Sequence, residues 1–179
     1  MPEVPTLTGR DGVVLRAPVD GDAAARRALG RDAEVLAGYG LSGEGATGPT
    51  ADACDAWLAE RRAAGAWMIE AEGALAGTVW LHSHDARDAR AQVAIGMLSA
   101  RFMGRGLGRA AMTLVLDHAF GTMGLHRVGL RVLATNVRAI ELYRGLGFRE
   151  EGREREAAAT AWGRVDDVIM GLLAWEWAP

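Results

Sequence analysis

A glycine-rich turn between an apolar strand and an amphipathic helix is the feature that most constrains this chain. Residues 93–110 read VAIGMLSARFMGRGLGRA, and the strand pattern ends at Leu98. After the turn, apolar residues recur at helical spacing, at positions 107, 110, 111, 114, 115 and 119. The first N–H groups of a helix have no intrahelical partner and lie at the positive end of the helix dipole. The segment therefore predicts an anion site suited to a phosphate-bearing ligand.

The spacing of the glycines narrows the kind of ligand. They stand at positions 104, 106 and 108 without a Gly-Lys-Ser/Thr sequence, so neither a Walker A loop nor a dinucleotide GxGxxG motif is present. The formal net charge of −3 argues against a broad nucleic-acid surface, and the local basic residues suit a small polyanion. A plain glycine-rich turn without a ligand is the alternative.

A second motif lies at residues 136–148, which read NVRAIELYRGLGF. Asn136 and Tyr143 are seven residues apart, or two helical turns, so both side chains project from the same helix face. Asn136 could also serve only as the helix N-cap, and Tyr143 could be a core tyrosine.

Together these motifs resemble the GNAT N-acetyltransferases. RGLGRA at 105–110 is similar to the (Q/R)-x-x-G-x-(G/A) signature of that family, and 136–148 is similar to the N-x-x-A-x-x-x-Y-x-x-x-G-F element that follows it. The resemblance implies an acetyl-CoA-dependent enzyme whose turn holds the pyrophosphate of CoA. It also implies that Asn136 contacts the pantetheine arm and that Tyr143 protonates the leaving thiolate as general acid. Locally the sequence is similar to the RimJ/RimL branch, whose members acetylate protein N-termini and small amines.

The resemblance assigns the CoA contacts to residues around both motifs. Gly96 lies inside the strand, where a glycine predicts a bulge or a close backbone approach. Arg101, Arg105 and Arg109 would add positive charge. The expected CoA-binding set is Met97, Leu98, Ser99, Met103, Gly104, Arg105, Gly106, Leu107, Gly108, Arg109, Asn136 and Tyr143.

A general base is not assigned by the resemblance. Many relatives carry Glu just before an Ile-Gly pair on this strand, but here the position is Ala94. The open candidates are a water chain and the side chains of His82, His84, Glu70, Glu72, Asp166 and Asp167. A site without a base favours an α-amine, with a pKa of about 8, over a lysine amine, with a pKa of about 10.4.

Three functions are compatible with these motifs. The first is transfer of acetyl from acetyl-CoA to a primary amine, either a protein N-terminal α-amine or a small-molecule amine. The second uses a longer acyl-CoA such as succinyl-CoA, or acetylates an antibiotic or a polyamine. The third is a non-catalytic acyl-CoA-binding regulatory module. Within the family the acceptor is set by loops, here expected at 36–49 and at 156–163, where Trp162 could contact it.

The hydropathy pattern predicts one α+β domain spanning residues 1–179. Strands are expected at 12–16, 66–71, 75–82, 91–98, 128–132, 148–155 and 165–173, and a GNAT fold implies about seven strands, about four helices and splayed central strands. Helices are expected at 20–29, capped by Asp20 or Asp22, after Thr50 or Asp52, at 106–123, and after Asn136.

The remaining features of the sequence indicate the compartment and the partners to expect. The single cysteine forms no internal disulfide, no metal-ligand spacing occurs, and neither a signal-peptide pattern nor an apolar run of roughly 18 residues is present. We therefore expect a cytoplasmic monomer or homodimer with no metal, nucleic acid or membrane as partner.

Overall fold

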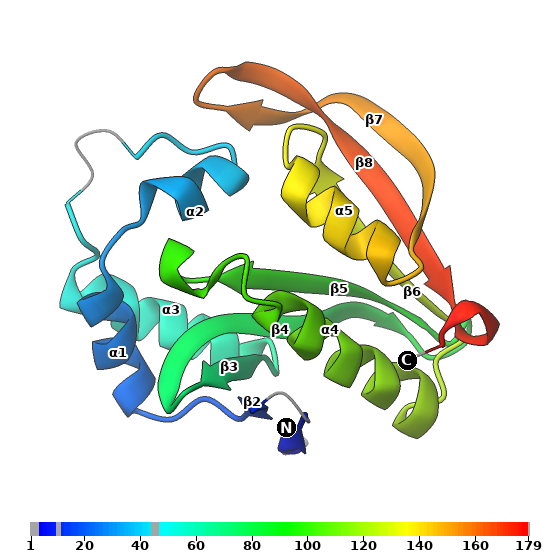
Figure 1. The fold of residues 1–179 in the computed structure, drawn as a ribbon, viewed down its shortest axis with the longest axis horizontal. Coiled ribbons are helices and arrows are strands. Elements are labelled where there is room, and N and C mark those ends of the chain that lie inside the picture. The colour runs from blue at the N-terminus through cyan, green and yellow to red at the C-terminus, as the bar shows by residue number, and fades with distance from the viewer. Residues whose placement is uncertain (1–3, 10–11, 44–46, 179) are drawn as a thin grey trace.

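The computed structural model describes residues 4–9, 12–43 and 47–178, which form an α+β fold on one open, mixed sheet (Figure 1). The described strands are ordered β1-β2-β3-β4-β5-β6-β8-β7, and all neighbours are antiparallel except β5 and β6. Their bounds are β1 (Leu7–Thr8), β2 (Val13–Arg16), β3 (Trp67–Ala71), β4 (Ala74–Asp85), β5 (Arg90–Met97), β6 (Arg127–Leu133), β7 (Arg149–Thr160) and β8 (Gly163–Leu173). The predicted mixed, mostly antiparallel sheet is confirmed, with eight strands rather than about seven.

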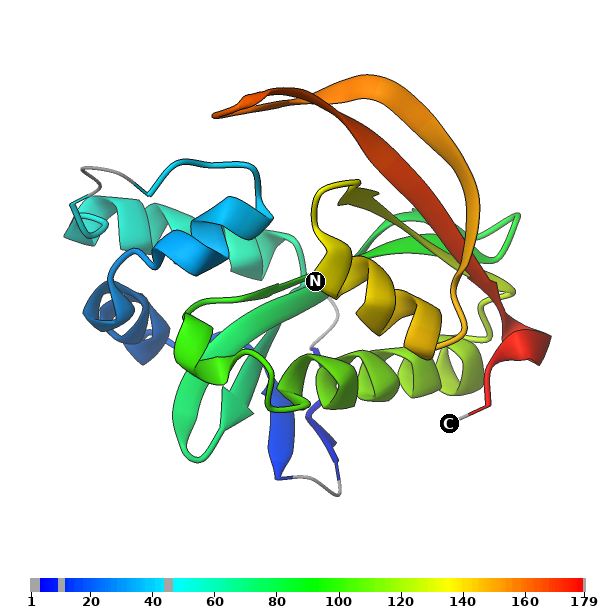
Figure 2. The same cartoon turned by 45° about the horizontal axis from the view of Figure 1, so that its top comes forward.

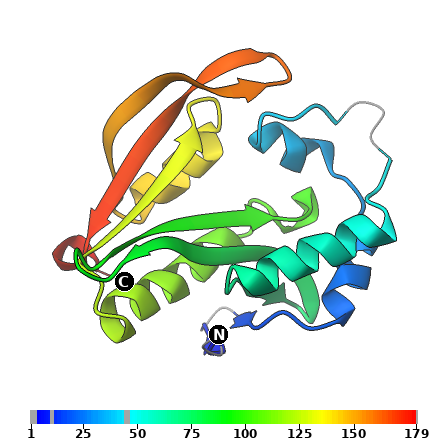
Figure 3. The same ribbon diagram turned by 180° about the vertical axis from the view of Figure 1, so that it is seen from behind.

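Helices pack on both faces of this sheet. The described ones are α1 (Gly21–Leu29), α2 (Ala33–Gly38), α3 (Ala51–Ala63), α4 (Leu107–Asp117) and α5 (Val137–Gly145). Figures 1 and 3 show α4 and α5 on one face and α3 on the other. One face of α4 is buried in the main core, and Leu107, Ala111 and Val115 lie on it as the spacing predicts. The prediction missed the buried Met112 and Leu116, and Ala110 and Leu114 are only partly buried. A π-helical turn (His118–Thr122) continues the helix to Gly124, whose φ of 65° suits a glycine after a helix end.

The sheet splays between its two parallel strands. β5 pairs with β4 along most of its length, from Gly77↔Met97 to Asp85↔Arg90. Against β6 it pairs only at residues 90–92 with residues 127–129, after which the two strands separate (Figure 2). The β6-facing edge of β5 therefore lacks a partner strand beyond Gln92, and this opening positions the site.

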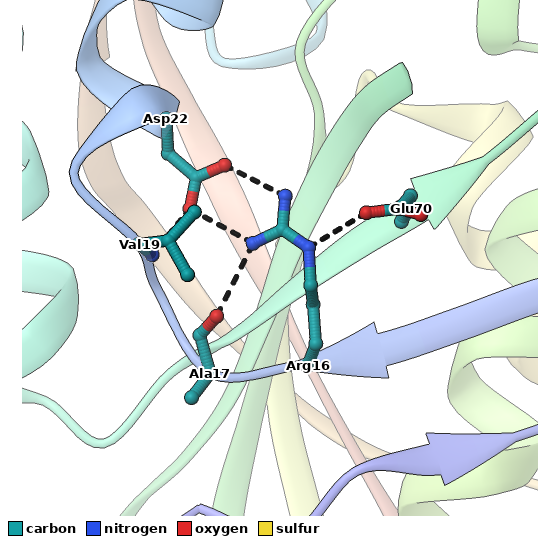
Figure 4. Close-up of polar contacts among 5 residues, drawn as sticks. All are labelled: Arg16, Ala17, Val19, Asp22 and Glu70. Carbon is teal, nitrogen blue, oxygen red and sulfur yellow. Dashed lines mark hydrogen bonds and ion pairs between the residues drawn. The ribbon is translucent and has the colours of Figure 1, made fainter. Parts of the chain in front are cut away.

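Arg16, the last residue of β2, links the start of α1 to the sheet (Figure 4). Its guanidinium donates to both carboxylate oxygens of Asp22, at 2.9 and 2.7 Å, and to Glu70 at 2.7 Å. The hydrogen bond to Asp22 is the main cause of a raised Arg16 pKa. Asp22 also accepts the Val19 N–H, and it is 2% exposed, so this is a nearly buried ion pair.

The expected cap of α1 is wrong. Asp20 occupies the N-cap position but makes no capping hydrogen bond, because its carboxylate pairs with Arg62 at 2.6 Å. Asp22 lies inside the first turn, where its carboxylate pairs with Arg16 and accepts the Val19 N–H just before the helix. Thr50, in contrast, caps α3 as predicted, since its hydroxyl accepts the Ala53 N–H.

Of the two loops expected to border the acceptor, the first is confirmed as a loop at 39–43 and 47–49, while its residues 44–46 lie outside the described part of the chain. Its first residues instead form the end of α2, which Asp32 caps by accepting the N–H groups of Glu34 and Val35. The second loop is largely wrong. In the second, β7 continues to Thr160 and β8 begins at Gly163, so only residues 161–162 form the turn. β7 is exposed over nearly its whole length, which explains why it lacks the alternation of apolar residues by which strands are recognised.

Candidate active site

A cavity of about 570 Å³ lies in the opening between β5 and β6. Its walls come from six parts of the chain: the free edge of β5, the turn before α4, β6, the start and buried face of α5, the end of α2, and β8 through Asp167. Figure 2 shows α2 and α5 facing each other across this region, with the turn before α4 below them. The sequence motifs at 93–110 and 136–148 thus meet at one site.

The turn before α4 has the geometry of an anion cradle. Gly104 and Gly106 adopt φ values of 69° and 80°, which suit glycine and turn the chain into the helix. The first hydrogen bond of the helix runs from the Ala110 N–H to the Gly106 carbonyl. The N–H groups of Leu107, Gly108 and Arg109 precede it and have no intrahelical partner. These residues line the cavity, so it ends on a helix N-terminus that suits a phosphate.

Only one of the three expected arginines lines this cavity. Arg109 does so, while its guanidinium donates to the Gly145 carbonyl at 2.8 Å. Arg105 instead pairs with Glu72 on the β3–β4 turn, and Arg101 stacks 4.4 Å from the centre of the Phe102 ring. Arg138, which the sequence analysis did not select, lines the cavity and pairs with Glu34 at 2.7 Å.

The expected CoA-binding residues divide into two groups by their position. Met97, Met103, Gly104, Gly106, Leu107, Gly108, Arg109, Asn136 and Tyr143 all line the cavity, whereas Leu98, Ser99 and Arg105 are not among its lining residues. The Leu98 N–H donates to the Ala76 carbonyl, and the Ser99 hydroxyl donates to Asp32, so both are directed to other partners.

Asn136 joins two elements at the cavity wall. Its Oδ1 accepts the Ala139 N–H, which makes it the N-cap of α5, as one reading of the sequence predicted. Its Nδ2 donates to the Gly38 carbonyl at 3.0 Å, at the end of α2. Asn136 therefore caps one helix and holds the other, and it lines the cavity as well.

Tyr143 is a buried residue on the wall of this cavity. It is 8% exposed, packs 5.9 Å from the Phe148 ring by their centroids, and lines the cavity from α5. Burial is the main cause of a raised Tyr143 pKa, and the nearby Tyr39 raises it further. The phenol is neutral near pH 7, as an ordinary tyrosine is, and burial makes it a weaker acid than a tyrosine in water.

Of the side chains considered as general base, only Asp167 lines this cavity. Its carboxylate pairs with Arg131 at 2.9 Å, and Arg131 also pairs with Glu154. The other candidates have partners or positions elsewhere: Glu70 binds Arg16, Glu72 binds Arg105, Asp166 accepts the Glu156 N–H, and His82 and His84 are exposed near the end of β4. Ala94 lies opposite Trp80 in the β4–β5 pair.

Tyr39 is a cavity residue that the sequence analysis missed. It is the C-cap of α2, and its hydroxyl approaches Gly96 so closely that a Cβ there would lie 1.8 Å from the hydroxyl oxygen. Gly96 pairs with Thr78 without a shift in register, so the expected bulge is absent there and the close approach is present. The glycine was a local signal of a close contact, but no neighbouring residue indicated that Tyr39 would be its partner.

Trp162, expected to contact an acceptor, is 69% exposed at the β7–β8 turn and is not a lining residue.

Two features are absent from the residues that the structure describes. No group of three or more His, Cys, Asp or Glu residues in this part of the chain could hold a metal ion. None of its helices combines the length and the apolar character needed to cross a bilayer.

Comparison with known proteins places these features in context. A family model described as an acetyltransferase (GNAT) domain matches residues 13–149. A spermidine N(1)-acetyltransferase of Escherichia coli (strain K12) is 35% identical over 86 residues, 48% of this chain and 46% of that protein. A ribosomal protein bS18-alanine N-acetyltransferase of Salmonella typhimurium (strain LT2) is 41% identical over 71 residues, 40% of this chain and 47% of that protein. The chain thus spans about half the length of these curated relatives.

Among solved structures, a spermidine N-acetyltransferase from Vibrio cholerae in complex with CoA and spermine has the same fold. Its TM-score is 0.75 at 22% identity, with 92% of this chain and 97% of that chain covered.

Proposed function

The chain belongs to the GNAT acetyltransferase family, and from this we propose that it transfers the acetyl group of acetyl-CoA directly to a primary amine in a ternary complex. The observation that carries the proposal is the single cavity that joins the glycine turn before α4 to Tyr143. A helix N-terminus lies at one part of it and a buried, neutral phenol at another. These are the two groups needed to hold a pyrophosphate and to protonate a thiolate.

Each step of the proposed reaction assigns a role to residues on the cavity wall. The N–H groups at the start of α4 and the Arg109 guanidinium would bind the pyrophosphate. The unpaired edge of β5 would hold the pantetheine arm by its main chain. The amine nitrogen would attack the thioester carbonyl carbon, the carbon–sulfur bond would break, and the thiolate would take the Tyr143 proton. The amine would lose its proton to water or to Asp167.

The charges on the cavity wall favour an acceptor that is not a polycation. The charged side chains among its described lining residues are those of Arg109, Arg131, Arg138 and Asp167. Asp167 already pairs with Arg131, so no unpaired carboxylate among them would bind a second ammonium group. A polyamine would bring several positive charges to this largely basic wall. We therefore propose a monoamine acceptor, with an α-amine, which is partly neutral at pH 7, as the preferred class.

The test combines an amine panel with the Tyr143→Phe variant. Acetyl-CoA is incubated with N-terminal peptides, amino acids, lysine derivatives and spermidine, and release of the CoA thiol is followed. We expect turnover with an α-amine, and we expect Tyr143→Phe to lower kcat by about 10²-fold, the scale of lost general acid catalysis. CoA affinity and the thermal midpoint, measured on the same variant, should stay near wild type, since only one hydroxyl is removed.

Three results would each contradict one part of the proposal. Wild-type turnover by Tyr143→Phe with the true acceptor would remove the acid role and leave Tyr143 a packing residue. CoA binding without thiol release for any acceptor or acyl-CoA would instead identify an acyl-CoA-binding regulatory module. Preferred turnover of spermidine would contradict the monoamine assignment alone.

A further inference from the structure

Tyr39 lines the cavity and has no role in the proposed reaction. Its ring reaches from the end of α2 to the opposite wall, where an ideal Cβ at Gly96 would lie 1.8 Å from the Tyr39 hydroxyl oxygen and 3.1 Å from its Cζ. The hydroxyl thus occupies the space that any side chain at position 96 would need. Tyr39 is nevertheless 52% exposed, so its ring borders open space and is not part of the packed core.

The residues on both sides of Tyr39 are fixed to different parts of the fold. Before it, the Gly38 carbonyl accepts the Asn136 side-chain N–H at 3.0 Å. After it, the Gly40 carbonyl accepts the Ala161 N–H at 2.7 Å, and Gly40 packs against Thr160. The main chain at Tyr39 is therefore held between α5 and the tip of the β7–β8 hairpin, whose approach to α2 is visible in Figure 1.

The other end of α2 is fixed to the strand that carries Gly96. Asp32, its N-cap, accepts the Ala100 N–H at 2.7 Å and the Ser99 hydroxyl at 3.2 Å, just beyond β5. These hydrogen bonds, with that of Ala100 the largest, also lower the pKa of Asp32, which keeps the carboxylate charged. Anchoring at both ends of α2 fixes the main chain from which the Tyr39 ring projects toward Gly96, and selection by size requires such a fixed base.

Tyr39 also lies near the proposed position of the thioester. Tyr39, Gly96 and Tyr143 all line the cavity, and Tyr39 is close enough to contribute to the raised Tyr143 pKa. If the pyrophosphate binds at the start of α4 and the sulfur lies beside Tyr143, as in the proposed reaction, the acyl group would lie near Gly96, where the Tyr39 hydroxyl is found. The Tyr39 ring would then face the end of the acyl chain.

We propose that Tyr39 sets the length of the acyl group, because its ring against Gly96 leaves room for acetyl and excludes longer chains. This inference rests on the proposed function, since it concerns the donor at that same site. It chooses acetyl-CoA over succinyl-CoA, the choice that the sequence left open. A rigid wall commonly discriminates by roughly 10-fold or more per added methylene.

The test compares the wild type with Tyr39→Ala and Tyr39→Phe on acetyl-, propionyl-, butyryl- and succinyl-CoA. With one acceptor, the wild type should have a kcat/KM at least about tenfold lower for butyryl-CoA than for acetyl-CoA. Tyr39→Ala should remove most of that difference, whereas Tyr39→Phe, which keeps the ring, should retain it. The proposal is overturned if the wild type accepts butyryl-CoA as well as acetyl-CoA, or if Tyr39→Ala leaves the ratio unchanged.

Titration separates this proposal from the proposed function. If no acyl-CoA is turned over, the proposed function fails, but the affinities for butyryl-CoA and acetyl-CoA still measure the acyl space. The same tenfold difference in Kd should then appear in the wild type and disappear in Tyr39→Ala; equal affinities in the wild type would overturn the inference.

A double variant checks the contact itself by thermal unfolding. Gly96→Ala places a methyl 1.8 Å from the Tyr39 oxygen and should lower the midpoint. Adding Tyr39→Phe leaves the nearest ring carbon at 3.1 Å and should restore part of the loss. A midpoint for Gly96→Ala equal to that of the wild type would show that the ring does not occupy this space.

Discussion

Replacing Gly108 separates ligand binding from folding more cleanly than other changes in the turn before α4. Gly108 is the second residue of α4, and a Cβ there would meet only the Leu142 Cδ2, at an ordinary contact distance of 3.6 Å. Alanine is preferred over glycine inside a helix by up to about 1 kcal/mol. For a chain of this size that corresponds to an increase in thermal midpoint of roughly 2–4 °C, so Gly108→Ala should unfold at or above the wild-type temperature.

The effect on CoA binding should have the opposite sign. A pyrophosphate held by the N–H groups at the helix start must approach the main chain closely, and a side chain at position 108 keeps it away. One lost hydrogen bond to a charged group corresponds to about 1.5–3 kcal/mol. At 1.4 kcal/mol per factor of ten, Gly108→Ala should weaken CoA binding by roughly 10- to 150-fold. Gly108→Val, with a bulkier side chain, should lose still more.

Isothermal titration with CoA and thermal unfolding together test this reasoning. The matched control is Gly121→Ala in the π-helical turn that continues α4, where a Cβ meets nothing within 4 Å and which does not line the cavity. The control should bind CoA with wild-type affinity. If Gly108→Val remains folded and its Kd for CoA is within about twofold of the control, the pyrophosphate does not lie on this helix terminus.

Two further variants test the fold and the proton transfer. Asp22→Ala removes the nearly buried partner of Arg16, a change that commonly costs about 3–5 kcal/mol, and because Glu70 still pairs with Arg16 the loss should lie at the lower end, with the thermal midpoint falling by roughly 10 °C. The exposed pair of Asp20 with Arg62 is the comparison, and Asp20→Ala should lower the stability by less than about 1 kcal/mol; equal losses would contradict the burial argument. For Asp167→Asn, we expect the ascending limb of kcat/KM against pH to follow the pKa of each amine offered, as in the unchanged enzyme. A limb that is fixed for every acceptor and lost in the variant would identify Asp167 as the base.

The sequence by itself determined the parts of the site that depend on neighbouring residues. The turn at 104–106, the start of α4 and the capping of α5 by Asn136 follow from glycine conformations, helix spacing and side-chain capping, which act within a few residues. The alternation of Val128, Leu130 and Val132 likewise predicted a strand with one buried face. These signals were sufficient for the α+β fold. The twelve expected contact residues came from the family resemblance, and nine of them line the cavity.

Only the tertiary structure decided which groups meet across the opening. Arg105 pairs with Glu72, 33 positions away in the sequence, and does not line the cavity. Asp167 lines the cavity because β8, which carries it, pairs with β6. Tyr39 and Gly96 meet across 57 positions because α2 is tied to both β5 and α5, and neither residue's neighbours encode that contact. Local propensity acts within a turn or two of chain, whereas the partners of a charge or a ring depend on how distant elements pack.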